Sequence, residues 1–463
     1  AKIFNTRVEK FYMFFNPKKS IIRAKKINGK WQVKFFADNV PSATVIMKDA
    51  MGQEMKDAKG QVMYRPMTPD ELQALDENDW RRYPDNTEWG LGWVPFGGYC
   101  SISGMVDETK SMSDLPSEPQ PWEFRTKPAW QRLLVMFGGV LFNFILGILL
   151  FSFSLFKWGD AYIPADRSSV YVYEGSLADE LGFKSGDIIL ALDDEPTEDF
   201  QNIQMDIARN MVSKVTILRD GEKTDIYIDQ KYISDILNNQ LFDLAIPFTV
   251  KELTDESLNK EADILTGDKI IMIDSTAIAY VQDALPVLEA KAGQEITATI
   301  LRDSMSFTLP LLVDEQGNIG VYFQIPNYER IEYSLLESIP AGCVKAYDTT
   351  VGQIKDLRLL AKPSTGAYKS VGSIIAITDA MPQQWNWLVF INILAMISII
   401  LAVMNLLPIP ALDGGHIVFT LYEMITGRKP SDKFLMAMQL IGMILIFGLM
   451  FLAFGNDIAR LMK

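Results

Sequence analysis

Three long apolar blocks dominate the hydropathy pattern of the chain. They cover 133–156, 385–412 and 434–455, and none of them contains a charged residue. A helix of about 20 apolar residues crosses the hydrocarbon core of a bilayer, so each block is long enough to span a membrane. Tryptophans such as Trp130 and Trp385 lie at the block ends, as is typical of membrane interfaces. The pattern predicts three transmembrane helices rather than core helices of a soluble protein.

The charges beside the blocks predict how the chain is oriented. Lys and Arg residues precede the first block and lie between the second and third, whereas the long stretch 157–384 is strongly acidic. Because short loops rich in Lys and Arg remain in the cytoplasm, we expect 1–132 and 413–433 on the cytoplasmic side. The acidic stretch and the tail 456–463 then lie outside.

Composition excludes several classes of protein. The chain has 463 residues, a net charge of −14, two cysteines and one histidine. An acidic chain lacks the basic face that nucleic acid requires, so we expect no nucleic-acid partner. Two cysteines cannot build a disulfide scaffold. One histidine excludes a zinc site that takes two or more histidines from this chain.

The acidic stretch contains an internal repeat. Gly186-Asp187 is followed by an apolar strand, and Gly267-Asp268 is followed by another; each copy then reaches a strand that ends in Leu-Arg-Asp. We therefore predict two copies of one small β-rich domain, over 160–230 and 231–325. These strings resemble the bacterial form of PDZ domains, in which an extended peptide adds to a sheet edge. Peptide binding and steric filtering of substrates both remain open, as does a generic β-rich pair.

Two further segments surround these elements. The insertion 20–88 contains a methionine-rich segment, 41–80, which we interpret as mobile or weakly ordered. A copper site built from these methionines is disfavoured, because they lack helical spacing. The stretch 335–384 has an apolar stripe at helical spacing from Val344 to Leu357. It predicts an amphipathic helix at the outer membrane surface, followed by a connector.

Candidate chemistry lies where the second block ends, in the string Asn405-Leu-Leu-Pro408-Ile-Pro410-Ala-Leu-Asp413-Gly414-Gly415-His416. A carboxylate within a span costs about 2.5–3.5 kcal/mol, so Asp413 is a candidate functional residue. The two prolines break the helix, and the two glycines let the backbone approach a neighbour closely. The alternative is an Asp that caps the next helix.

This string resembles the second signature of the site-two protease family of intramembrane zinc metalloproteases. Further parts match in order. The string around Pro95 to Tyr99 resembles the family's re-entrant β-hairpin, here expected over 89–106, and Trp130 to Asn143 resembles the start of its second span. The two PDZ-like copies and Ser370 to Ile374 match the regulator-of-sigma-E protease type. The implied fold is a multi-pass α-helical membrane protein with a re-entrant β-hairpin and two inserted PDZ-like domains.

The resemblance implies a zinc site that uses Asp413 as one ligand. In the family, a His-Glu-x-x-His motif on the first transmembrane helix supplies two more ligands and the general base. This motif does not occur in the sequence. We expect it upstream of Ala1, so that no catalytic residue lies in this chain; a pseudoenzyme is the alternative. His416 is interpreted as a packing or capping residue.

Substrate-binding candidates follow from the same resemblance. A strand edge formed by Gly97, Gly98, Tyr99, Cys100 and Ser101 would hold an unwound substrate segment. Asn405 would hold a substrate carbonyl or, equally, join two helices, and Asn143 is expected to join helices.

The expected function is a zinc endopeptidase that cleaves transmembrane segments of membrane proteins during regulated intramembrane proteolysis. Its substrates would be single-span helices, such as anti-sigma factors or signal-peptide remnants. The expected location is the bacterial inner membrane, with the PDZ-like domains on the periplasmic side. The alternative is a membrane scaffold that binds peptides and does no chemistry; a transporter is disfavoured because the spans show no inverted repeats.

Overall fold

The computed structural model describes residues 1–39, 43–48, 53–55, 63–94, 97–105, 119–325, 329–379, 381–382 and 384–462. The chain forms two compact units, and each is described by itself. Unit 1 comprises 1–141 with 405–442, and unit 2 comprises 142–404 with 443–463.

Three long apolar helices confirm the predicted spans: α2 (Ala129–Trp158), α9 (Trp387–Leu406) and α11 (Asp432–Leu461). Their most apolar windows have mean hydropathies of 2.5, 2.6 and 2.4, and each helix is long enough to cross a membrane. Large side chains such as Phe142 and Phe451 are exposed on them, as lipid-facing residues would be. The second helix ends at Leu406 rather than at the predicted 412, because the prolines that follow cannot continue it.

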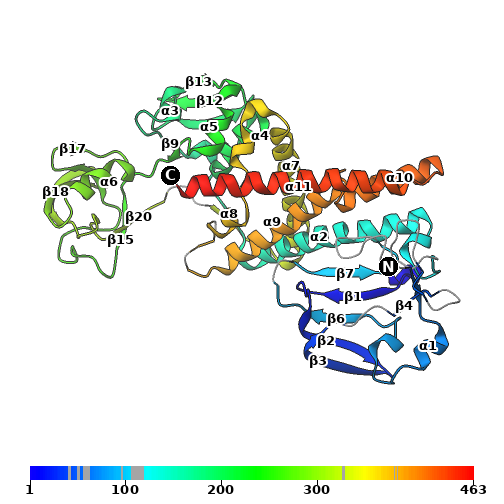
Figure 1. The fold of residues 1–463 in the computed structure, drawn as a ribbon. Helices are drawn as coiled ribbons and strands as arrows, with labels where there is room; N and C mark the ends of the chain where they lie inside the picture. Colours follow the sequence, from blue (N-terminus) through cyan, green and yellow to red (C-terminus); the bar gives the residue numbers. More distant parts are fainter. Residues whose placement is uncertain are drawn as a thin grey trace. The chain divides into compact units, whose positions relative to one another are not determined.

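A five-stranded sheet forms much of the N-terminal part of unit 1. Its strand order is β3-β2-β6-β1-β7 (Figure 1). The strands are β1 (Val8–Tyr12), β2 (Lys19–Ile27), β3 (Lys30–Asp38), β6 (Glu88–Leu91) and β7 (Tyr99–Ile102). The predicted hairpin over 89–106 is wrong, because β6 and β7 do not pair with each other. Strand β1 lies between them, parallel to β6 and antiparallel to β7.

The insertion is also more regular than predicted. Strands β2 and β3 pair along their full lengths, and β2 also pairs with β6. The described part of 41–80 contains β4 (Thr44–Ile46) paired with β5 (Tyr64–Pro66), and α1 (Pro69–Gln73). These described residues therefore form a short ladder and a capped helix that the sequence pattern does not predict, while the mobility of the segment stays a prediction. Met51, Pro95 and Phe96 lie outside the described residues.

Unit 2 contains the predicted repeat, and the two copies share one topology. The first sheet has the order β11-β10-β12-β13 and the second β17-β16-β18-β19. The first copy contains β10 (Ile188–Leu192), β11 (Glu195–Pro196), β12 (Lys214–Arg219), β13 (Glu222–Tyr227), α3 (Leu177–Glu180), α4 (Ile203–Asn210) and α5 (Ile233–Asn238). The second contains β16 (Lys269–Ile273), β17 (Thr276–Ala277), β18 (Glu295–Arg302), β19 (Met305–Leu312) and α6 (Val281–Ala290).

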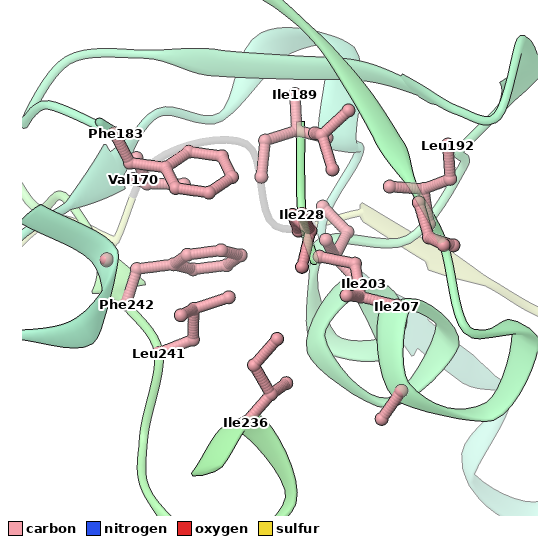
Figure 2. Packing of buried hydrophobic residues seen from close by; sticks show 14 of the residues in the cluster. Val170, Phe183, Ile189, Leu192, Ile203, Ile207, Ile228, Ile236, Leu241 and Phe242 are labelled. Atoms are coloured by element: carbon pink, nitrogen blue, oxygen red, sulfur yellow. The ribbon is translucent and has the colours of Figure 1, made fainter. Parts of the chain in front are cut away.

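Short strand pairs complete the repeats and connect them to the helices. These are β9 (Val170–Tyr171) with β14 (Asp243–Leu244), β15 (Val250–Leu253) with β20 (Val321–Phe323), and β8 (Asp160–Tyr162) with β21 (Glu329–Ile331). Each repeat has its own apolar core, and Figure 2 shows the first, where Phe183 and Phe242 lie beside each other in one cluster with the isoleucines of α4.

The Gly-Asp and Leu-Arg-Asp motifs of each repeat meet in space. The Arg219 guanidinium donates to both carboxylate oxygens of Asp187, at 2.7 Å each. Arg302 binds Asp268 with the same two distances. Both aspartates are buried, and Arg302 holds the pKa of the Asp268 carboxyl below its ordinary value. In each repeat, the Gly-Asp motif and the Leu-Arg-Asp motif are therefore joined by the same buried ion pair between aspartate and arginine.

Helix α7 (Leu335–Leu360) confirms the helix predicted after the second repeat. Its Ala346 packs with residues of α2 and α9, and Lys345 pairs with Asp160 at 2.8 Å. Towards its C-terminal end, Asp356 accepts two hydrogen bonds from Arg209 of α4, at 2.8 and 3.0 Å. Helix α7 thus joins the apolar helices to the first repeat; its place at a membrane surface stays a prediction.

Candidate active site

The chain turns sharply between α9 and α10 (Asp413–Thr426). Pro408 and Pro410 fall within this turn, and Ala411 has a φ of 88°, which is strained for a residue with a Cβ. Close packing around the turn is needed to keep Ala411 in this strained conformation. The glycines of the motif and of a neighbouring helix provide that packing.

Three glycines bring helices against the turn. A Cβ on Gly414 would lie 2.1 Å from the Leu407 carbonyl oxygen, and one on Gly415 would lie 2.6 Å from that of Ile409. Gly442 of α11 comes closer still, since a Cβ there would lie 1.3 Å from the Pro410 carbonyl oxygen. No larger residue fits at these positions without moving the backbone. The motif glycines were predicted to permit close approach, and the structure confirms it.

Asp413 is the first residue of α10 and does not cap it. The N-cap is Leu412, and no side chain there caps the helix. Within the described residues, the half-buried Asp413 carboxylate has neither a hydrogen bond nor an ion pair. The alternative interpretation as a helix cap is therefore wrong.

Gly139 of α2 lies beside the Asp413 carboxylate. A Cβ on Gly139 would lie 3.9 Å from Asp413 Oδ2, which is an ordinary van der Waals distance. His416 lies one turn along α10 from Asp413. Its side chain makes no hydrogen bond within the described residues, so it packs rather than caps.

The described side chains do not by themselves complete a catalytic zinc site. Among the described residues, no group of three or more His, Cys, Asp or Glu side chains could hold a metal ion. A catalytic zinc takes three protein ligands and an open position. Asp413 is suited to be one of them, because a half-buried carboxylate without a partner is costly unless a cation compensates it.

Strand β7 belongs to the same unit as Asp413 and packs near it. Ile102 of β7 forms a buried apolar cluster with Met136 of α2 and Ile417 of α10. Ile417 lies one turn after Asp413, and Met136 lies one turn before Gly139. An ion pair between Arg132 and Glu423, at 2.6 Å, also ties α2 to α10. Sequence reasoning missed this pair, because nothing local relates two residues so far apart in the chain.

The side chains of the predicted substrate strand mostly serve the sheet. Tyr99 stacks on Tyr12, with ring centroids 5.4 Å apart, and its hydroxyl donates to Asn16 at 2.8 Å. Ser101 is buried, whereas Cys100 is exposed. A Cβ on Gly98 would lie 2.4 Å from the Tyr12 carbonyl oxygen, so this glycine permits close strand approach. Gly97, with φ 96°, has open space around it.

The two asparagines of the apolar helices α2 and α9 differ in their surroundings. At Asn143 it is the backbone carbonyl that joins helices, by accepting a hydrogen bond from Ser398 of α9 at 2.9 Å. Asn405 lies half-buried in the last turn of α9, and its amide makes no hydrogen bond within the described residues. Neither asparagine side chain is seen to join helices.

Comparisons with known proteins agree with this geometry. The pattern of peptidase family M50 matches residues 79–449, which is most of the chain. The chain belongs to peptidase family M50. A relative from Ralstonia nicotianae whose name describes a zinc metalloprotease is 25% identical over 418 residues, covering 82% of this chain and 88% of its own length. The regulator of sigma E protease of Haemophilus influenzae is 26% identical over 415 residues, with coverages of 82% and 89%.

The glycine contacts give a direct test of the turn. Gly442→Ala should lower the free energy of unfolding by about 1–3 kcal/mol, because the methyl group overlaps the Pro410 carbonyl. Gly448→Ala, on the same helix, meets no atom within 4 Å and is the matched control. Thermal unfolding of both variants in detergent measures the difference. Equal melting temperatures would show that α11 does not pack on the turn.

Proposed function

We propose that this chain carries the metal-binding aspartate of an intramembrane zinc protease that cleaves transmembrane segments of membrane proteins. Membership of peptidase family M50 makes it a metalloprotease, and zinc is its cofactor. The observation that carries the finer proposal is Asp413. Its carboxylate stands half-buried and without a described partner just after an apolar helix, where a cation would compensate it.

The role of each group in the site follows from ordinary zinc chemistry. Zinc lowers the pKa of bound water and thereby supplies a nucleophile at neutral pH. Asp413 supplies a negative ligand, and the strained turn with its three glycines holds that ligand in position. The remaining ligands and the general base are assigned to a His-Glu-x-x-His motif on a helix before Ala1, by resemblance to the site-two protease family.

A transmembrane substrate must be unwound before it can be cut, since a helix uses its carbonyl groups in its own hydrogen bonds. Strand β7 is suited to hold the unwound segment because it ends the five-stranded sheet and packs near α10. The backbone of Gly97 to Ser101 would pair with substrate, since the Tyr99 and Ser101 side chains serve the sheet. Asn405 would donate to a substrate carbonyl.

The proposal also includes the location of the protein and the orientation of its repeats. The three apolar helices make it a membrane protein. We place it in the bacterial inner membrane, with both repeats on the periplasmic side, where they would exclude proteins with bulky outer domains. Single-span proteins, such as anti-sigma factors already cut outside the membrane or signal-peptide remnants, would then be admitted. A scaffold without catalysis is the second candidate, favoured by a groove in the second repeat.

Asp413→Asn separates the protease from the scaffold. The amide keeps the size of the side chain but loses the charge that helps to hold a divalent cation, so zinc content and cleavage should both fall by at least about tenfold. His416→Gln is the control and should keep its zinc. Both are measured by metal analysis and by cleavage of a transmembrane peptide, on a chain that includes the upstream helix. Wild-type zinc and rate in the Asn variant would remove Asp413 from the site.

The role of β7 predicts different effects of two changes at one position. Tyr99→Pro removes a backbone donor from the strand, whereas Tyr99→Phe loses only the hydroxyl that donates to Asn16. The cleavage rate of the Pro variant should fall by more than the loss of folded protein indicated by its lower melting temperature. The Phe variant, compared at matched stability, is the control. If activity simply follows melting temperature in both variants, β7 supports the fold and does not bind substrate.

The orientation is tested by labelling from outside the cell. Lys30, the first residue of β3, and Lys223, in β13, are both exposed. A cysteine introduced at 223 should react with a membrane-impermeant thiol reagent in a background where Cys100 and Cys343 are replaced by Ser. One introduced at 30 should react only after the membrane is opened. The reverse pattern would place the repeats in the cytoplasm.

A further inference from the structure

The second repeat contains a groove of about 480 Å³ between α6 and strand β20. Its floor is apolar: Val281, Leu285 and Leu288 come from α6, and Phe248 lies just before β15. Leu285 is 49% exposed, so an apolar side chain faces the solvent of the groove. Strand β20 pairs with β15 along one side, and its residues Val321 to Phe323 line the groove. An added strand would therefore lie between β20 and α6.

In the first repeat, the apolar face of the matching helix α4 is buried rather than open. Ile203 and Ile207 of α4 are covered by Ile236, Leu241 and Phe242 (Figure 2). The side chain of Gln204 fixes this cover, since it donates to the Ile236 carbonyl at 2.7 Å and accepts from the Leu241 N–H at 3.0 Å. In the first repeat, side chains of the protein fill the position beside α4. In the second repeat, the matching position beside α6 is open.

The described lining of the groove is acidic. Asp255, Glu256 and Asp314 line it, and its lining includes no Lys, Arg or His. Asp255 and Glu256 are exposed. Lys260 lies nearby and donates to the backbone carbonyl of Asp255, but it does not line the groove. Positive side chains of a bound segment would be attracted here, and negative groups would be repelled.

At one end of the groove, two backbone N–H groups of the loop before β20 are already bound by a carboxylate of the protein. The Asp314 carboxylate accepts hydrogen bonds from the N–H groups of Gln316, at 2.9 Å, and of Asn318, at 2.7 Å. Backbone N–H groups of such a loop are what would bind the carboxylate of a peptide C-terminus. Here Asp314 occupies two of them, and its negative charge would oppose a second carboxylate.

We infer that this groove binds an extended internal segment of a partner protein, with apolar side chains towards α6 and Lys or Arg side chains towards the acidic rim, and rejects a free C-terminal carboxylate. The inference deepens the proposed function, because it names the chemistry by which a membrane-protein substrate would be recognised outside the membrane. Binding needs no cleavage, so its test is independent of Asp413.

The test uses the full chain in nonionic detergent and fluorescence anisotropy of labelled peptides of about eight residues, the length of an ordinary strand. The probe alternates Val and Lys and ends in an amide. A second peptide has the same sequence with a free carboxylate, and a third replaces Lys by Glu. The amide should bind on the order of fivefold more tightly than the free acid, and the Glu peptide should bind weakest.

Two variants distinguish binding in the groove from a general attraction of the basic peptide to an acidic protein. Leu285→Arg blocks the groove, whereas Met305→Arg adds the same charge at an exposed position in β19 that does not line it. Binding of the Val-Lys amide should be lost in the first and retained in the second. Equal affinity of amide and free acid, equal loss in both variants, or no binding by the wild type would each overturn the inference.

Discussion

The close packing of glycines against the backbone of the turn at Pro408 and Pro410 determines where Asp413 lies. Gly414 and Gly415 let α10 begin directly beneath the turn, and Gly442 lets α11 cross it at a distance that no Cβ allows. The strained Ala411 is held in place by this packing. Because the backbone is held from two sides, the carboxylate that follows is directed away from helix capping and remains available to a cation.

That constraint also explains why the neighbouring elements are needed. Helix α2 contributes Gly139 beside the carboxylate and Met136 to the cluster with β7, while Arg132 holds α10 through Glu423. A five-stranded sheet then supports β7 through β1. The proposed zinc ligand Asp413 and the strand proposed to hold substrate are in this way tied to one pair of helices, which would let both act on the same unwound segment.

The two repeats share one fold but differ in the packing beside one helix. Both keep the buried Asp–Arg pair, and both have the same strand order. The first repeat has filled the face of α4 and is tied to α7 through Arg209 and Asp356. The second keeps its groove open beside α6. A copy that is anchored and closed is suited to a structural role, and one that is open is suited to recognition.

The sequence alone determined those features whose signal is local. Apolar length predicts the three spans, the paired Gly-Asp motifs predict the repeat, and the prolines and glycines around Asp413 predict a tight turn with a functional carboxylate. Each depends on residues a few positions apart. Tertiary structure decided the rest. It inserted β1 between β6 and β7, paired β4 with β5 within 41–80, left Asp413 without a capping role, and closed one repeat while leaving the other open. These outcomes depend on which distant backbone and side chains meet, and strand pairing and groove filling leave no periodic signal in the chain.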